Sequence, residues 1–120
     1  MNDSILLSIK KMIGIAEDYK HFDADIIIHI NSTFAILAQL GVGPESGFYI
    51  TDETAKWSDF LTDDSHHLLD NVKTYMFMKV KTMFDPPMSS SVADAYNRLI
   101  SEMEWRLNVA AETEVDALRV

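Results

Sequence analysis

The fold is decided by the stretch from residue 23 to residue 40, which reads DADIIIHINSTFAILAQL. At about 100° per residue, one side of a helix here carries an unbroken row of large apolar side chains: Ile26, Ile30, Phe34 and Leu37. Asp23 has a side chain of the type that caps a helix N-terminus, and Gly41 is a residue that commonly ends one. We therefore predict a long helix from Asp23 to about Leu40, with this row in the core.

Comparable signals predict the remaining helices. They are an opening helix over residues 4–13 that ends at Gly14, a helical turn over 55–61, a long helix capped by residues 63–65 and running to about Phe84, and a last helix from about Ser91 to about Ala111. Asp85, Pro86 and Pro87 separate the last two, since proline lacks the backbone donor that a helix needs. In the last helix, we expect the core row to be Val92, Tyr96, Leu99, Met103, Leu107 and Ala110.

Residues 48–51 are aromatic and β-branched, and they are bounded by Gly47 and Asp52. This composition predicts an extended segment, which could be half of a small hairpin. The predicted fold is therefore mainly α: a compact bundle of four to five helices with a short extended or β excursion around residues 47–52. We expect residues 1–111 to form a single helical domain and residues 112–120 to form an acidic, flexible C-terminal tail.

Charge and composition exclude several classes of protein. The formal net charge is −9, which repels a phosphate backbone and argues against a protein that reads nucleic acid, although DNA could still pass alongside. The absence of cysteine excludes disulfides and thiolate chemistry. No apolar stretch approaches the roughly 20 residues of a membrane span, and the opening residues do not resemble a signal peptide. We expect a soluble protein that is not secreted through a cleaved signal.

The strongest hint of site chemistry is the spacing of His21, Asp25 and His29, four residues apart. Such spacing can place imidazole and carboxylate groups around a zinc ion. However, His21 precedes the predicted cap at Asp23, and no further ligand or general base is marked nearby, so solvated or paired histidines explain the pattern better. No phosphate-binding loop or activated nucleophile is present either. We therefore predict no enzyme activity, no cofactor and no metal site.

Three of the predicted helices carry more apolar residues than one core row requires. Scattered exposed apolar residues are common, and a helix in a compact bundle can be buried on all sides. The alternative is that the additional side chains contact other proteins, with tryptophan the residue most typical of such contacts. On this second explanation we predict an interface with other copies or other proteins formed by Ile28, Ile36, Phe77, Met78, Trp105 and Val109.

Three stretches of the sequence together point to a known family. The first runs from Lys10 to Ile15 and continues over residues 21–31; the second runs from residues 39–44 to 57–61. The third runs from residues 72–75 through 84–87 to Ala95, Tyr96 and residues 104–108. In these stretches the chain resembles the head–tail connector proteins of tailed bacteriophages, also called adaptor or head-completion proteins. The order of helix, aspartate-capped helix, aromatic loop, long helix, proline break and last helix is similar to that of members from phages of Gram-positive hosts.

This resemblance implies a virion structural protein at the head–tail junction, made in the host cytoplasm. It implies a ring, commonly a dodecamer, that docks beneath the portal protein, extends the DNA channel and joins the capsid to the tail through a tail-side completion protein. DNA would pass through without specific binding, and no catalytic residue is implied. The alternative hypothesis is a small helical regulatory module that uses the same surfaces to sequester a phage or host protein.

Overall fold

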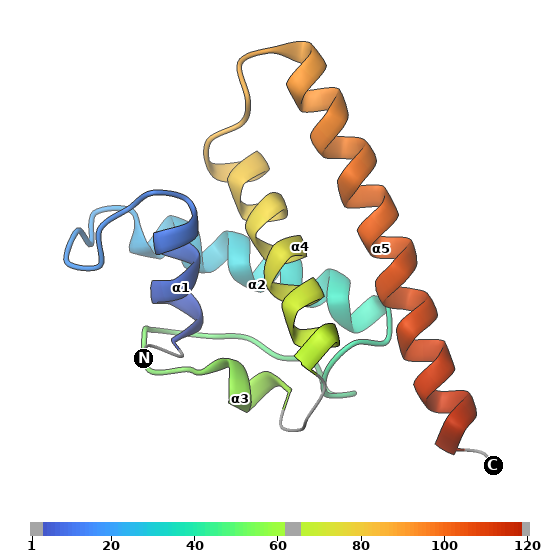
Figure 1. Ribbon diagram of the computed structural model, residues 1–120. Helices are drawn as coiled ribbons and strands as arrows, with labels where there is room; N and C mark the ends of the chain where they lie inside the picture. The colour runs from blue at the N-terminus through green and yellow to red at the C-terminus, as the bar shows by residue number, and fades with distance from the viewer. Residues whose placement is uncertain (1–3, 62–65, 119–120) are drawn as a thin grey trace.

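The structure is a computed structural model that describes residues 4–61 and 66–118. This part of the chain contains five helices (Figure 1): α1 (Ile5–Met12), α2 (Asp23–Gln39), α3 (Trp57–Phe60), α4 (His66–Phe84) and α5 (Ser90–Leu118). The predicted mainly α bundle is therefore confirmed. The residues expected to cap the third long helix, Asp63, Asp64 and Ser65, lie outside the described part of the chain.

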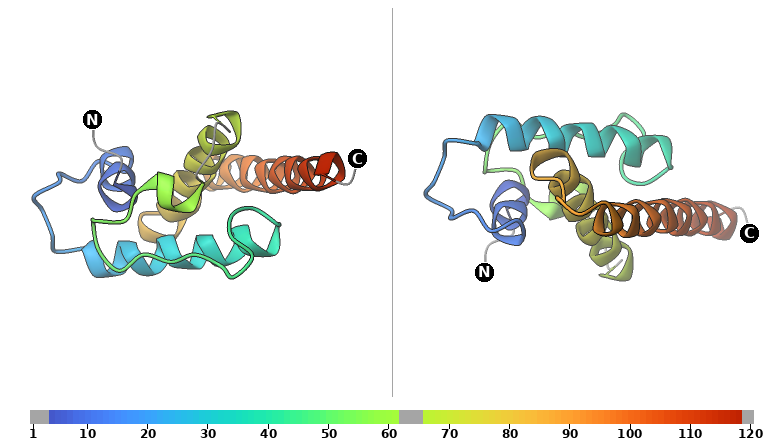
Figure 2. Two further views of the ribbon diagram at one scale, coloured as in Figure 1. Left: turned by 90° about the horizontal axis from the view of Figure 1, so that it is seen from below. Right: turned by 90° about the horizontal axis from the view of Figure 1, so that it is seen from above.

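Helix α4 is the central element, because it packs against α1, α2 and α5. Helices α2 and α5 lie on different sides of α4 (Figure 2) and approach each other only where α2 ends. There the side-chain amide of Asn108 on α5 donates a hydrogen bond of 3.1 Å to the carbonyl of Leu40. Each of these two helices consequently keeps one long side that no other described element covers.

The core is built on the predicted row of α2, and all four of its side chains are buried. Phe34 lies in an aromatic cluster with Phe48 and Phe60, whose ring centroids are 5.0 and 4.7 Å from its own. Trp57 completes this cluster and donates a hydrogen bond of 2.8 Å from its indole nitrogen to the Ser8 hydroxyl on α1. The short helix α3 therefore serves mainly to bring two aromatic rings under α2.

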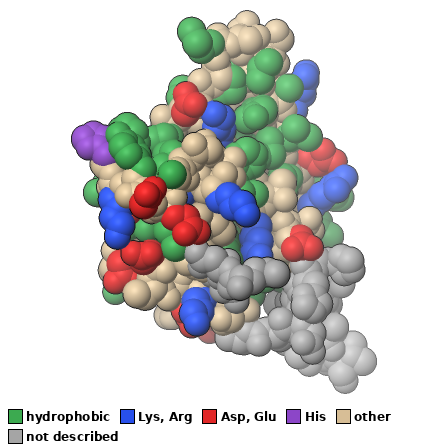
Figure 3. All heavy atoms as spheres, turned by 60° about the vertical axis from the view of Figure 1, so that its left-hand side comes forward, with side chains coloured by type: hydrophobic (Ala, Val, Ile, Leu, Met, Phe, Trp, Pro, Cys, Tyr) green, Lys and Arg blue, Asp and Glu red, His purple; other side chains and the backbone are tan. Residues whose placement is uncertain are grey.

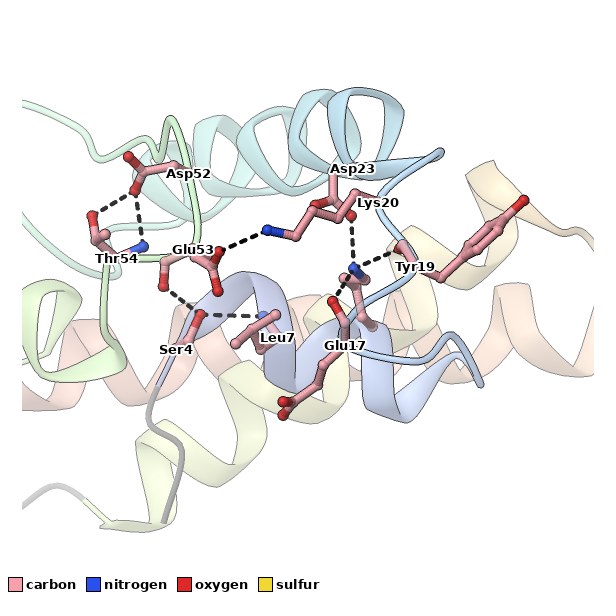
Figure 4. Close-up of polar contacts among 10 residues, drawn as sticks. Ser4, Leu7, Glu17, Tyr19, Lys20, Asp23, Asp52, Glu53 and Thr54 are labelled. Carbon is pink, nitrogen blue, oxygen red and sulfur yellow. Dashed lines mark hydrogen bonds and ion pairs between the residues drawn. The ribbon is translucent and has the colours of Figure 1, made fainter.

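The start of α2 differs from the prediction. Asp23 is the first helical residue and not the cap; the capping position is Phe22, which makes no side-chain capping bond. The Asp23 carboxylate instead forms an ion pair of 2.8 Å with Lys10, whose side chain is fully buried. The Lys10 ammonium also donates to the carbonyls of Glu17 and Tyr19, at 3.0 and 2.8 Å (Figure 4). The cation thereby ties α1, the following loop and α2 together.

The segment around residues 47–52 forms no strand in the described part of the chain, where the only bridge joins Ser4 to Lys56. The side chain of Asn31 on α2 takes the place of a neighbouring strand. Its amide donates to the Ile50 carbonyl at 2.9 Å, and its carbonyl accepts from the Ile50 backbone nitrogen at 2.8 Å. One polar side chain therefore satisfies both backbone groups of a buried residue.

The last helix is longer than the sequence suggested, since α5 continues past the expected end near Ala111 to Leu118. The division into a domain over residues 1–111 and a tail over residues 112–120 stays a prediction. Across the described ranges, no helix combines the length and the apolar character needed to cross a bilayer.

Candidate interaction surface

Helix α5 buries only part of the row that we expected: Leu107 is in the core, and Tyr96 and Met103 pack against it. Ile100 and Leu107 are buried, whereas Val92 and Leu99, which were assigned to the core row, are exposed. The reason is that α5 packs on α4 alone, apart from the contact with the end of α2, and an edge helix buries only a narrow arc. The apolar residues outside that arc are left on the surface.

These residues form what we call the α5 outer face. It consists of the apolar side chains Ala95, Leu99, Trp105 and Val109, with the charged side chains Arg98, Glu102 and Arg106 between them. Trp105 is 67% exposed, which is more than Leu99 or Val109 on the same face. Arg106 forms an ion pair of 2.7 Å with Glu102. Ala95, Arg98, Leu99 and Glu102 line a shallow hollow on this face.

The second uncovered surface is the α2 outer face, formed by exposed residues on the side opposite the buried row: Ala24, Asp25, Ile28, Ser32, Ala35, Ala38 and Gln39. Ile28 is 62% exposed and is the only large apolar side chain among them. Asp25 is the only charged one. Ile28 therefore stands among small and polar side chains, with one charged side chain on the same face.

The structure divides the predicted interface residues into two groups. Ile28, Trp105 and Val109 are exposed on the two outer faces, so contact with another protein stays a prediction for them. Ile36 and Phe77 are partly buried and pack against the core, and Met78 is a core residue with only 7% of its surface exposed. In the described structure, these last three side chains pack within the subunit's own fold.

The histidines considered as metal ligands lie against aromatic rings. His21 packs edge-on against Phe22, with ring centroids 4.8 Å apart, and His29 lies 6.5 Å from the ring of Phe84. Among the side chains that the structure describes, no three His, Asp or Glu groups come together in a way that could hold a metal ion. The spacing of His21, Asp25 and His29 therefore does not assemble into a site there.

Sequence reasoning missed other exposed apolar side chains. Tyr49 in the loop before α3 and Met88 in the turn before α5 are more than two-thirds exposed. Figure 3 shows that hydrophobic side chains form an interrupted band on another face of the molecule, with acidic and basic side chains around it. Position in a loop, two residues after Gly47 for Tyr49 and directly after Pro87 for Met88, was the available signal, because loops run over the surface.

A comparison with known protein families matches residues 5–114 to the family described as "Phage connector protein". The chain belongs to the phage connector protein family. The match runs from α1 through most of α5, so it includes both outer faces of this phage connector. No curated protein and no solved structure matched the connector chain. Membership makes it a structural component of a phage particle, which acts through contacts with other virion proteins.

Proposed function

We propose that this connector is a head–tail adaptor whose copies form a ring under the portal protein, extend the DNA channel and join the capsid to the tail. The observation that carries the proposal is that two uncovered faces, on α2 and α5, lie on different sides of α4 (Figure 2). Two different faces that bind each other between identical copies produce a head-to-tail chain of subunits, which closes into a ring when the rotation allows it.

The charge of the chain is consistent with a channel wall. A net charge of −9 on each copy gives the phosphate backbone of DNA no attractive surface, so DNA could pass without being held. The same charge makes the copies repel one another. Because the Debye length is about 8 Å at physiological ionic strength, salt would screen this repulsion and favour assembly.

The partners in this proposal are further copies of the chain, the portal protein and a tail-side completion protein at the head–tail junction. The loop over residues 43–54 and the end of α5 are the candidates for reaching the portal or the tail side. The loop carries Tyr49, whose ring is largely exposed, and tyrosine is enriched where proteins contact each other. We propose no catalytic residue, because the function is one of assembly.

Electron microscopy of the purified chain mixed with the portal protein from the same genome tests the proposal. We expect ring-shaped density on one end of the portal and none when the protein carries both Ile28→Asp and Trp105→Ala. A matched control is Ser58→Ala together with Ser101→Ala, which changes two exposed residues outside both outer faces. Portal particles without added density, in the presence of excess folded protein, would rule out the connector position.

A further inference from the structure

We infer that the α5 outer face of one copy packs against the α2 outer face of the next copy, with the two helices running in the same direction, Arg98 beside Asp25 and Trp105 over Ser32. This inference rests on the proposed ring and names the pair of surfaces that would build it. It is carried by the size of the side chains on the two faces, by two unpaired charges and by the spacing along both helices.

The two faces are complementary in size. The α5 outer face carries the large side chains Leu99, Trp105 and Val109, which stand out from an edge helix. The α2 outer face carries mainly small side chains, Ala24, Ser32, Ala35 and Ala38, with Ile28 as its only large apolar one and the polar Gln39 at its end. Large side chains on one helix pack well into the depressions that small side chains leave on another. An indole ring over Ser32 would lie between Ile28 and Ala35.

The two faces are also complementary in charge. Arg98 and Asp25 are exposed, and in the described part of the chain neither forms an ion pair or a side-chain hydrogen bond. Arg106, by contrast, is already paired with Glu102. An arginine and an aspartate without partners at matching places on two apolar faces would set the register of the contact more than its strength.

The spacing of the residues selects a direction. Arg98 and Trp105 are seven residues apart, as are Asp25 and Ser32, so each pair spans about 10.5 Å along its helix. Helices that run in the same direction therefore bring Trp105 to Ser32 when Arg98 meets Asp25. With the opposite direction, Trp105 would lie over residue 18, in the loop before α2 begins.

The competing arrangement is a symmetric pair of α5 outer faces. If two α5 helices crossed in opposite directions around Glu102, Arg98 of each copy would lie next to Arg106 of the other. Like charges placed across an interface disfavour association. The pairing of α5 with α2 avoids this contact, and it leaves each copy with one free face of each kind for its two neighbours.

Disulfide trapping tests the inference directly, because the chain contains no cysteine. One protein carries Ala35→Cys on the α2 outer face, and a second, with a different affinity tag, carries Val109→Cys on the α5 outer face. Both changes leave Asp25, Ile28, Arg98 and Trp105 intact. After mild oxidation of an equal mixture, we expect the mixed disulfide to exceed each homodimer by at least about fivefold, since docking raises the local thiol concentration.

The matched control replaces Val109→Cys by Asn97→Cys, which is exposed on the same helix but lies outside the α5 outer face. The control should give mixed disulfides and homodimers in the statistical ratio. A statistical ratio for the Ala35→Cys and Val109→Cys mixture, or a majority of Val109→Cys homodimers, would overturn the inferred pairing.

Charge reversal gives a second readout on the same trap. Arg98→Glu should reduce the yield of the mixed disulfide by several-fold, and adding Asp25→Lys to the partner protein should restore it. Failure of this rescue would overturn the register. Ring-shaped density on the portal without a preferred mixed disulfide would refute this pairing and leave the proposed function standing. A preferred mixed disulfide without any density on the portal would support the pairing and refute the connector position.

Discussion

The hydroxyl of Tyr75 on α4 donates a hydrogen bond of 2.7 Å to a carboxylate oxygen of Glu104 on α5. Tyr75 is fully buried, whereas Glu104 is partly exposed at the seam between the two helices. Burial is the main cause that raises the pKa of the Tyr75 phenol above its ordinary 10.0, and the hydrogen bond to Glu104 and the negative charge of that carboxylate raise it further.

This contact predicts a specific loss of stability in alkali. The folded pKa of Tyr75 lies above the unfolded value, so the unfolded chain releases the proton first as the pH rises. The stabilisation is therefore complete below pH 10 and declines above it, by about 1.4 kcal/mol per pH unit. Tyr75→Phe should lower the free energy of unfolding at neutral pH by about 1 to 2 kcal/mol and remove this alkaline component. Urea unfolding from pH 7 to 11 measures both effects.

The control for that measurement is Tyr49→Phe, because Tyr49 is a largely exposed tyrosine in a loop. It should leave the stability at pH 7 unchanged. If the free energy of unfolding fell equally steeply with pH above pH 10 in the wild type and in Tyr75→Phe, the assigned role of the Tyr75 phenol would be contradicted.

The buried Lys10 cation is expected to be essential for folding. Lys10→Met removes three interactions at once and leaves the Asp23 carboxylate and two carbonyls without their donor. Removing one partner of a buried ion pair costs about 3 to 5 kcal/mol. The matched control is Lys81→Met, because Lys81 forms an equally short pair of 2.8 Å with Asp85 on the exposed side of α4. It should lose less than about 0.5 kcal/mol. Denaturant unfolding that gave similar losses for both variants would refute this assignment.

Gly43 and Gly47 provide a comparison in which only packing differs. Both have a left-handed backbone, with φ of 91° and 87°, which costs other residues about 1 to 2 kcal/mol. A Cβ at Gly43 would overlap the ring of Phe60, whereas a Cβ at Gly47 would meet nothing within 4 Å. Gly43→Ala should therefore lose about 1 to 3 kcal/mol more than Gly47→Ala. Thermal unfolding of the two variants side by side checks this, and equal melting temperatures would refute the close approach.

Trp105 is expected to matter for assembly and not for folding. Trp105→Ala should leave the melting temperature of the isolated subunit nearly unchanged, because the side chain is mostly exposed, and should weaken assembly on the portal. Leu107→Ala, two residues further along the same helix, removes a buried side chain and should cost about 2 to 5 kcal/mol of folding stability. Scanning calorimetry and sedimentation of the same samples separate the two effects. If Trp105→Ala unfolds the subunit, the residue belongs to the core.

The parts of the fold that depend on neighbouring residues in the sequence could be predicted. The apolar row of α2, the stops at Gly14 and Gly41 and the break at Pro86 and Pro87 are all local signals, and each lies where it was expected. The burial of Lys10 could not be predicted in this way, because it depends on two carbonyls and a carboxylate that only the folded chain brings together. The two hydrogen bonds between Asn31 and Ile50 depend likewise on tertiary contact.

The candidate surface was predictable only in part, for a related reason. Helical periodicity shows which residues share a side of α5, but the number of neighbouring helices decides how many sides are buried. Leu99 was assigned to the core because the last helix was expected to lie within a bundle, yet it lies at the edge. Trp105 was placed on the surface by the same periodicity, since its direction is far from that of Leu107 on any helix.

The contact between Tyr75 and Glu104 and the bond from Asn108 to Leu40 have a consequence for the proposed assembly. Together they hold α5 at one tilt relative to α4 and α2. The number of copies that close a circle depends on the angle between the two faces of each copy. A dodecamer requires a step of about 30°, and adding one copy changes that step by only about 2°. In such an assembly, two hydrogen bonds inside each subunit would determine the circumference of the passage.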